Sequence, residues 1–175
     1  ATGLAEADLN SIRLNRATLE RASLNLANLE HADLELANLN GAQLRQAKVT
    51  AAVLSQATLQ GADLTGANLE CADLSRANLG GANLERANLT GANLDLTNLK
   101  NSRLDGAIVD AKWRLVQEIT TTGISGRDLR GSDLQRANLA GADLGGASLE
   151  GANLAGADLS RADLRGANLK GADLS

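Results

Sequence analysis

Two side chains of types that often catalyse reactions occur once each in this chain. His31 follows Glu30, and Cys71 stands in the same local setting after Glu70. A cysteine nucleophile needs a base within hydrogen-bond reach, and no second histidine exists to serve Cys71. A single cysteine also excludes an internal disulfide. We therefore interpret both residues as surface positions and not as a catalytic pair.

Metal and phosphate motifs are the next chemical possibility. Calcium-binding β-rolls use a nine-residue glycine–aspartate repeat, which this sequence does not contain. The segment TTGISGRD, around Gly123 and Gly126, lacks the lysine of a phosphate-binding loop. The sequence thus indicates no catalytic residues, no metal site and no cofactor, and we expect a protein that is not an enzyme.

His31 and Cys71 lie within a sequence repeat of five residues. In GADLTGANLECADLSRANL, residues 61–79, leucine recurs at Leu64, Leu69, Leu74 and Leu79, with alanine two residues before each. Five residues rotate an α-helix by about 500°, so the leucines would form no apolar stripe. On a straight strand an odd period would send them to alternating faces. The chain must therefore turn once in every repeat.

Glycine indicates where the turn lies. It occupies the second residue after the central leucine at Gly61, Gly66 and Gly81, where a type II turn requires a positive φ. Turning the same way in every repeat winds the chain into a solenoid, whose coils pair through their backbones about 4.8 Å apart. Within a repeat, we expect alanine and leucine to point inward and the residue between them to point outward.

The repeat extends over nearly the whole chain. Of 33 central positions, 30 are leucine, and the exceptions are Val49, Val109 and Ile124. Each buried leucine contributes roughly 1.5–3 kcal/mol, so the ladder supplies a large core. This A(D/N)LXX pattern resembles that of the pentapeptide repeat proteins. The resemblance implies an all-β solenoid, a right-handed quadrilateral β-helix with four repeats in each coil of 20 residues.

One segment, DAKWRLVQEITTTG, interrupts the repeat. Asp110 is a favourable N-cap, and Gly123 followed by an apolar residue is typical of a helix C-terminus. Trp113 and Val116 share one helical face, so we expect a short amphipathic helix of about ten residues that packs through them. The run of three threonines before Gly123 favours the alternative, a flexible connector.

The interruption divides the chain into three parts. We expect a first block of repeats at 1–109, the helix or connector at 110–123, and a second block at 124–175 that continues the same solenoid. Glycine fills 8 of 10 turn positions from Gly126 to Gly171, but only 6 of 22 from Glu6 to Ala111. The two blocks therefore have separate origins, or their repeats have drifted apart.

A coil of 20 residues places side chains 20 positions apart in one column. His31 and Cys71 would then lie two coils, or roughly 10 Å, apart, which is too far for a hydrogen bond between nucleophile and base. Asp143 would stack on Asp163 in the same way. The family resemblance suggests that such outward Asp and Asn side chains bond to neighbouring backbone.

Interaction surfaces remain as functional candidates. One face of the first block carries apolar side chains at three outward positions, Leu36, Val53 and Leu96. Three such residues on one face favour a contact site. Our leading hypothesis is a non-catalytic, rigid scaffold for protein–protein interaction, whose protein partner the sequence does not identify.

Mimicry of DNA is the alternative hypothesis. Some pentapeptide repeat proteins bind a type II topoisomerase (gyrase) and resemble duplex DNA in shape and charge. Duplex DNA carries about one negative charge per 1.7 Å of its axis, whereas this chain has 17 basic and 21 acidic residues and a net charge of −4. That balance disfavours the alternative, and we expect no direct binding of nucleic acid.

The ends of the solenoid predict self-association. Solenoids usually need terminal caps with a polar outer face, but the repeats run on to Leu174. The family resemblance favours dimers formed through a terminal coil. We therefore expect a homodimer through the C-terminal coil, involving Leu164, Leu169 and Leu174.

Targeting signals are missing from the 175 residues. No stretch approaches the ~20 apolar residues of a membrane span, and no signal-peptide core occurs. We expect a cytoplasmic protein without membrane contact. A leader peptide removed by cleavage would not be seen in these 175 residues.

Overall fold

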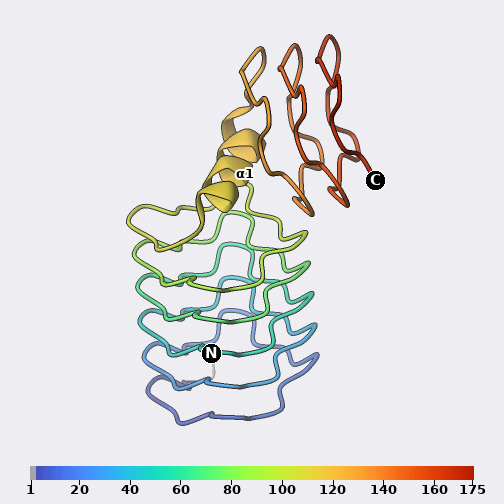
Figure 1. Ribbon diagram of the computed structural model, residues 1–175. Coiled ribbons are helices and arrows are strands. Elements are labelled where there is room, and N and C mark those ends of the chain that lie inside the picture. Colours follow the sequence, from blue (N-terminus) through green and yellow to red (C-terminus); the bar gives the residue numbers. More distant parts are fainter. Residues whose placement is uncertain (1–2) are drawn as a thin grey trace. The chain divides into compact units, whose positions relative to one another are not determined.

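The structure, a computed structural model, describes residues 3–175. The chain forms two compact units, Ala1–Asp110 and Ala111–Ser175, which we call the first and second units. In each unit the backbone winds into coils (Figure 1). That the second unit continues the solenoid of the first stays a prediction.

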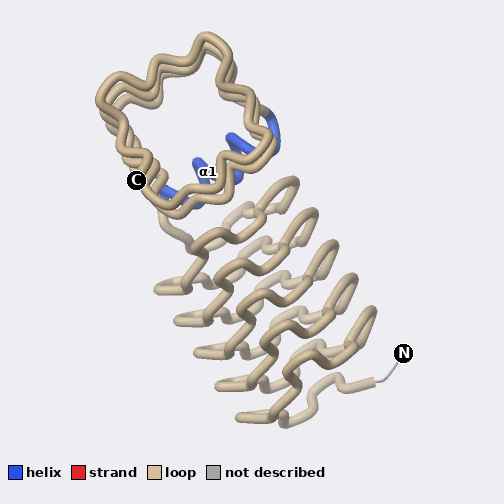
Figure 2. The backbone as a smooth tube through the Cα atoms, turned by 90° about the vertical axis from the view of Figure 1, so that its right-hand side faces the viewer, coloured by secondary structure: helices blue, strands red, loops and turns tan. Residues whose placement is uncertain are grey.

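Residues 20 positions apart pair between consecutive coils. Asp8 forms a parallel bridge with Asn28, and Asn28 forms the next bridge with Lys48. The N–H of Asn28 donates to the carbonyl of Ala7 (2.9 Å), and the N–H of Leu29 donates to the carbonyl of Lys48 (2.7 Å). The bridges are isolated, so residues 3–175 contain no strand of ordinary length. One coil thus holds four five-residue repeats and has four sides, as the second unit shows in Figure 2.

A tight turn closes each repeat. The N–H of Ala37 donates to the carbonyl of Leu34 (3.0 Å). The residue before each such alanine has a positive φ whether it is glycine, as at Gly41 (63°), or not, as at Leu36 (59°) and Cys71 (57°). Glycine therefore marks turns as expected, but the coil imposes the same left-handed conformation on leucine, arginine and cysteine, for which it is sterically less favourable.

Leucine and alanine fill the interior of the coils. Leu69 is fully buried and lies in one column with Val49 and Leu89, whereas Glu70 is exposed. This confirms the expected inward and outward positions. Thr97 takes the place of an inward alanine, and its hydroxyl donates to the carbonyl of Leu74 (2.8 Å). Such a bond removes the penalty of burying a polar group.

The outward Asp and Asn side chains brace the turns. The Oδ1 atom of Asn78 accepts the N–H of Gly80 (3.0 Å) and the side-chain amide of Asn98 in the next coil (2.9 Å). The Oδ1 atom of Asp73 accepts the N–H of Ser75 (3.0 Å) in the same way. These are Asx-type bonds, so the outward, backbone-bonding role implied by the resemblance is present.

The single helix of the described chain is α1, Ala111–Thr122. It begins directly after Asp110 and ends before Gly123, whose φ is 68°. Trp113 and Val116 are buried on one face. The connector alternative is wrong, because the threonines belong to the helix and the buried Thr120 hydroxyl donates to the carbonyl of Val116 (2.9 Å).

Charged side chains tie α1 to the coils of the second unit. The Lys112 ammonium lies 3.6 Å from the Asp133 carboxylate and 4.7 Å from the centre of the Trp113 ring. Glu118 forms an ion pair with Arg127. Within residues 3–175, no helix has the length and apolarity that crossing a membrane would require.

Candidate interaction surfaces

The residues singled out for chemistry do not come together. His31 and Cys71 occupy the same turn column, two coils apart, with Ala51 between them. Across the described residues, no three histidine, cysteine or acidic side chains lie where they could share a metal ion.

The apolar face expected from the sequence lies in the first unit. Leu36 is 39% exposed and Val53 is 38% exposed, while Leu96 is partly exposed. Leu36 and Leu96 share one turn column, and Val53 belongs to the paired column that precedes this turn, between Asp33 and Asp73. We call Leu36, Val53 and Leu96 the apolar patch.

Two further exposed apolar residues were missed by the sequence reasoning. Leu26 is 51% exposed at a turn, and Ile108 is 61% exposed at an outward position. Both occupy outward places of the repeat, so the counting that identified Leu36 would have found them. Leu26 borders a hollow of about 400 Å³ whose lining also includes Arg45 and Arg86.

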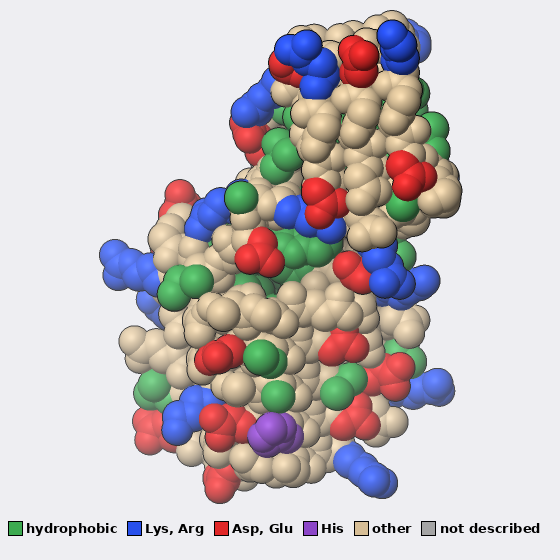
Figure 3. All heavy atoms as spheres, in the orientation of Figure 1, with side chains coloured by type: hydrophobic (Ala, Val, Ile, Leu, Met, Phe, Trp, Pro, Cys, Tyr) green, Lys and Arg blue, Asp and Glu red, His purple; other side chains and the backbone are tan. Residues whose placement is uncertain are grey.

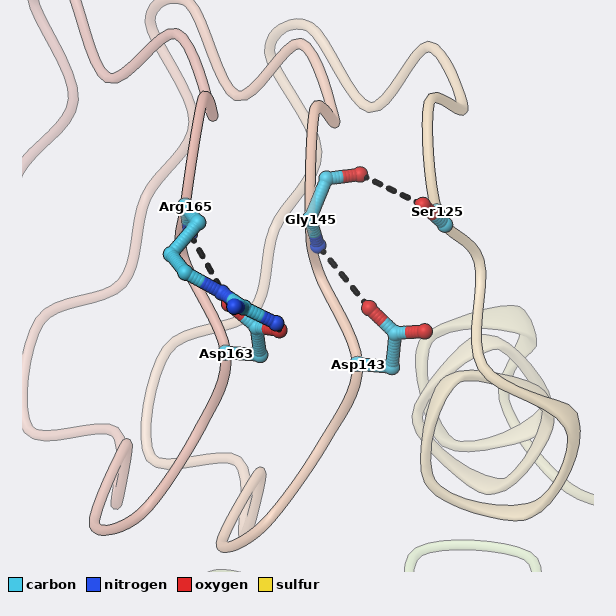
Figure 4. Close-up of polar contacts among 5 residues, drawn as sticks. All are labelled: Ser125, Asp143, Gly145, Asp163 and Arg165. Carbon is cyan, nitrogen blue, oxygen red and sulfur yellow. Dashed lines mark hydrogen bonds and ion pairs between the residues drawn. The ribbon is translucent and has the colours of Figure 1, made fainter.

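A larger hollow, of about 540 Å³, lies in the second unit. It opens at a turn column that carries no side chains, because Gly126, Gly146 and Gly166 follow one another there. Figure 4 shows the polar residues around it. The hollow is lined by Ser125, Gly126, Asp143, Gly145, Gly146, Asp163 and Arg165.

One carboxylate of this hollow is already paired with a guanidinium. Arg165 donates through Nε to Oδ1 of Asp163 (2.9 Å) and through Nη2 to Oδ2 (2.6 Å). These hydrogen bonds lower the pKa of Asp163 to about 2. Arg130 holds Asp128 in the same bidentate way, at 2.9 and 2.7 Å, and also lowers the pKa of that carboxyl to about 2.

The other carboxylate, that of Asp143, has no such partner. Gly145 stands where the next coil has Arg165, and its N–H donates to Oδ1 of Asp143 (3.1 Å). The Ser125 hydroxyl donates to the carbonyl of Gly145 (2.9 Å), which fixes the wall of the hollow (Figure 4). The pKa of Arg165 is raised first by its hydrogen bond to Asp163 and least by the charge of Asp143.

The last coil of the second unit exposes part of its leucine column. Leu144 and Leu149 are fully buried, because a further coil covers them. Leu164 and Leu169 are partly exposed, and Leu174 is 55% exposed. Leu159, in the same coil, is partly exposed as well.

Comparison with known proteins decides the family. The model of the pentapeptide repeats matches in eight copies, at residues 4–41, 37–70, 72–109, 125–154 and 142–175. This chain is a member of the pentapeptide repeat family. Between the matches at 72–109 and 125–154 lies the stretch 110–124, which contains α1.

Solved structures of pentapeptide repeat proteins resemble this one. A protein of the Arabidopsis thaliana thylakoid lumen is 29% identical with a TM-score of 0.54, over 62% of this chain and 72% of its own. Rfr23 of the cyanobacterium Cyanothece 51142 is 37% identical with a TM-score of 0.46, over 57% of this chain and 65% of its own length. HetL of Nostoc sp. strain PCC 7120, a protein involved in the regulation of heterocyst differentiation, is 34% identical with a TM-score of 0.32, over 94% of this chain and 79% of its own. The comparison with curated proteins gave no match.

Proposed function

We propose that this pentapeptide repeat protein is a non-catalytic scaffold that binds a protein partner through the apolar patch of its first unit. Proteins of the matched family are generally structural or protein-interaction scaffolds, which supports the proposal. The exposure of Leu36 (39%) and Val53 (38%) on adjoining columns carries the proposal. Protein interfaces are most apolar at their centre, and burying a leucine there contributes roughly 1.5–3 kcal/mol.

Matched variants test the patch. Leu36→Gln with Val53→Thr removes most of its apolar surface, and glutamine already occupies the same left-handed turn position at Gln56. The control is Leu26→Gln, which removes an exposed leucine from a column where Gln46 already takes that conformation. We expect the double variant to lose a protein that the wild type captures from a lysate of the source organism, and the control to retain it.

The captured protein would then be purified and its affinity for each variant measured by calorimetry. We expect binding to the double variant to be at least about tenfold weaker, the effect of roughly 1.4 kcal/mol. Equal affinity of the double variant and the wild type would show that the patch is not the contact site.

Mimicry of DNA is the alternative function, and the distribution of acidic and basic residues in this chain argues against it. The first unit has 9 basic and 13 acidic residues, and the second has 8 of each. On the face shown in Figure 3, acidic and basic side chains are interspersed. Duplex DNA instead presents about one negative charge per 1.7 Å of axis. Inhibition of gyrase supercoiling at sub-micromolar protein would reverse this ranking.

We further propose that two copies associate through Leu164, Leu169 and Leu174. The support is the exposure of these leucines in the last coil, since a second copy would cover them as a further coil covers Leu144. The coils are inferred to wind to the right, as the family resemblance implies.

A further inference from the structure

We propose that the hollow beside Asp143 in the second unit binds the guanidinium group of an arginine side chain from a partner protein. The inference deepens the scaffold function by giving the chemistry of a second contact. It does not depend on the apolar patch, which lies in the first unit.

The second unit itself shows how this fold holds a guanidinium. In the sequence Asp163-Leu164-Arg165, the arginine follows the outward aspartate by two residues and grips it with two parallel hydrogen bonds of 2.9 and 2.6 Å. Asp128 and Arg130 repeat the arrangement. Planar, bidentate pairs of this kind are among the stronger hydrogen-bonded contacts of proteins. An outward aspartate on this coil is therefore a preformed receptor for an arginine.

The carboxylate of Asp143 is held by the backbone in the same way as that of Asp163, but no arginine follows it two residues later. Its Oδ1 atom accepts the N–H of Gly145, as Oδ1 of Asp163 accepts the N–H of Arg165 (3.0 Å). Among the aspartates that directly precede a central leucine, Asp143 is the one that glycine follows at the second position. The place that a side chain would fill is thus part of the open hollow of about 540 Å³.

The neighbouring glycines keep this place accessible. Gly126 and Gly146 leave bare backbone at the adjoining turn. Their N–H groups already donate to the carbonyls of Gly145 (2.7 Å) and Arg165 (2.9 Å) in the next coil. The N–H groups of Gly126 and Gly146 are therefore already bonded, and the hollow contains a carboxylate, that of Asp143, to which no guanidinium is bonded.

The local charges favour a cation in the hollow. Arg165 compensates Asp163, so the charge of Asp143 remains uncompensated by an ion pair within the described residues. A guanidinium fits better than an ammonium, because its planar fork matches both carboxylate oxygens whereas an ammonium acts as a point charge. The occupant is thus an arginine and not a lysine.

The experiment is a titration of the whole chain followed by amide NMR spectra. The probe is the peptide acetyl-Gly-Arg-Gly-amide, with acetyl-Gly-Lys-Gly-amide as the matched cation. We expect the arginine peptide to shift the resonances of Gly145 and Gly146 in a saturable way, with weak affinity because a single exposed ion pair binds weakly. The lysine peptide should bind about threefold more weakly or worse.

Two variants and a control locate the effect. Asp143→Asn preserves the shape, since Asn78 makes the same bond to the N–H of Gly80, and should abolish saturation. Gly145→Arg should fill the hollow with the chain's own guanidinium and block the peptide. Ala140→Arg adds the same charge at the corresponding turn position after Asn138 and should leave binding unchanged.

Three results would overturn the proposal. These are no saturable shift with the arginine peptide, equal binding of the lysine peptide, and undiminished binding to Asp143→Asn. None of them bears on the scaffold function, because that test uses variants of Leu36 and Val53 in the other unit.

Discussion

Leu69 and Glu70 are neighbours in the chain with opposite surroundings. The Leu69 side chain is fully buried in the column of Val49 and Leu89, and Glu70 is exposed. Leu69→Asp would bury an unpaired charge in place of a leucine, so we expect it to lower the free energy of unfolding by about 4 kcal/mol or more. Glu70→Ala should change it by less than about 0.5 kcal/mol. Urea unfolding measures both, and similar midpoints would contradict the inward position of Leu69.

The ion pair of Asp163 with Arg165 predicts how pH affects the stability of the folded protein. Its pKa is lowered to about 2 by the hydrogen bonds from Arg165, against about 3.9 in an unfolded chain. A carboxyl with a lowered pKa in the folded state stabilises that state above the unfolded pKa. The contribution is lost as the pH falls from about 4 through about 2. It is small because the Arg165 side chain is 91% exposed, so that water screens the pair.

The measurement is an NMR titration of the Asp163 side-chain carbonyl. We expect a midpoint of about 2 in the wild type and a return toward the ordinary range for aspartate in Arg165→Gln. Asp128, which Arg130 holds in the same way, should be unaffected by that change and serves as the internal control. An unchanged midpoint in the variant would show that Arg165 does not cause the shift.

At the scale of elements, α1 can be followed through one residue. Trp113 is the single aromatic residue among Phe, Tyr and Trp, and it is 6% exposed. We expect blue-shifted emission and little quenching by iodide in the native protein, with a red shift on unfolding, because burial removes the indole from water. Emission near that of free tryptophan in the native state would contradict the buried position.

A second variant separates burial from the charge that lies over the ring. Lys112 is 4.7 Å from the ring centre and 3.6 Å from Asp133. Lys112→Met keeps an unbranched side chain over the ring but removes the cation. The emission should remain blue-shifted in this variant, since it reports the burial of Trp113 and not the cation–π contact.

At the scale of the whole molecule, the uncovered leucine column predicts association. Leu174 is 55% exposed at the end of the last coil. Leu174→Glu places a charge where a second copy would pack, so we expect sedimentation equilibrium to show a dimer for the wild type and a monomer for the variant. The far-UV circular dichroism of the two should agree. A monomeric wild type across a wide range of concentration would refute the dimer.

The coil, its inward leucines and the helix could be predicted because each is encoded locally. The spacing of Leu64 and Leu69 predicts the turn between them. Gly123 indicates the end of α1, because the residue that ends a helix in this way adopts a positive φ. Thr97 shows the limit of such reasoning. It departs from the alanine pattern, yet it is fully buried, because a carbonyl from another coil accepts its hydroxyl.

The sequence predicted a positive φ at the turns that contain glycine but not at the turns that contain other residues. Glycine signalled a positive φ at Gly61, but Leu36 and Cys71 adopt the same conformation without a local preference for it. Their N–H groups donate to carbonyls of the next coil, Ser55 (3.0 Å) and Thr90 (2.9 Å). Pairing between coils therefore imposes the strain that glycine avoids elsewhere.

By itself, the sequence determined that the chain turns once in five residues and which side chains enter the core, because both follow from periodicity. The family resemblance, and not the local periodicity, predicted that outward residues 20 positions apart become neighbours, and the structure confirms this pairing. The tertiary structure decided where such neighbours leave open space between them, because that depends on side chains from several coils at once. The hollow beside Asp143 is of this second kind. It arises from glycines in successive coils, and from an arginine that is present after Asp163 and replaced by glycine after Asp143.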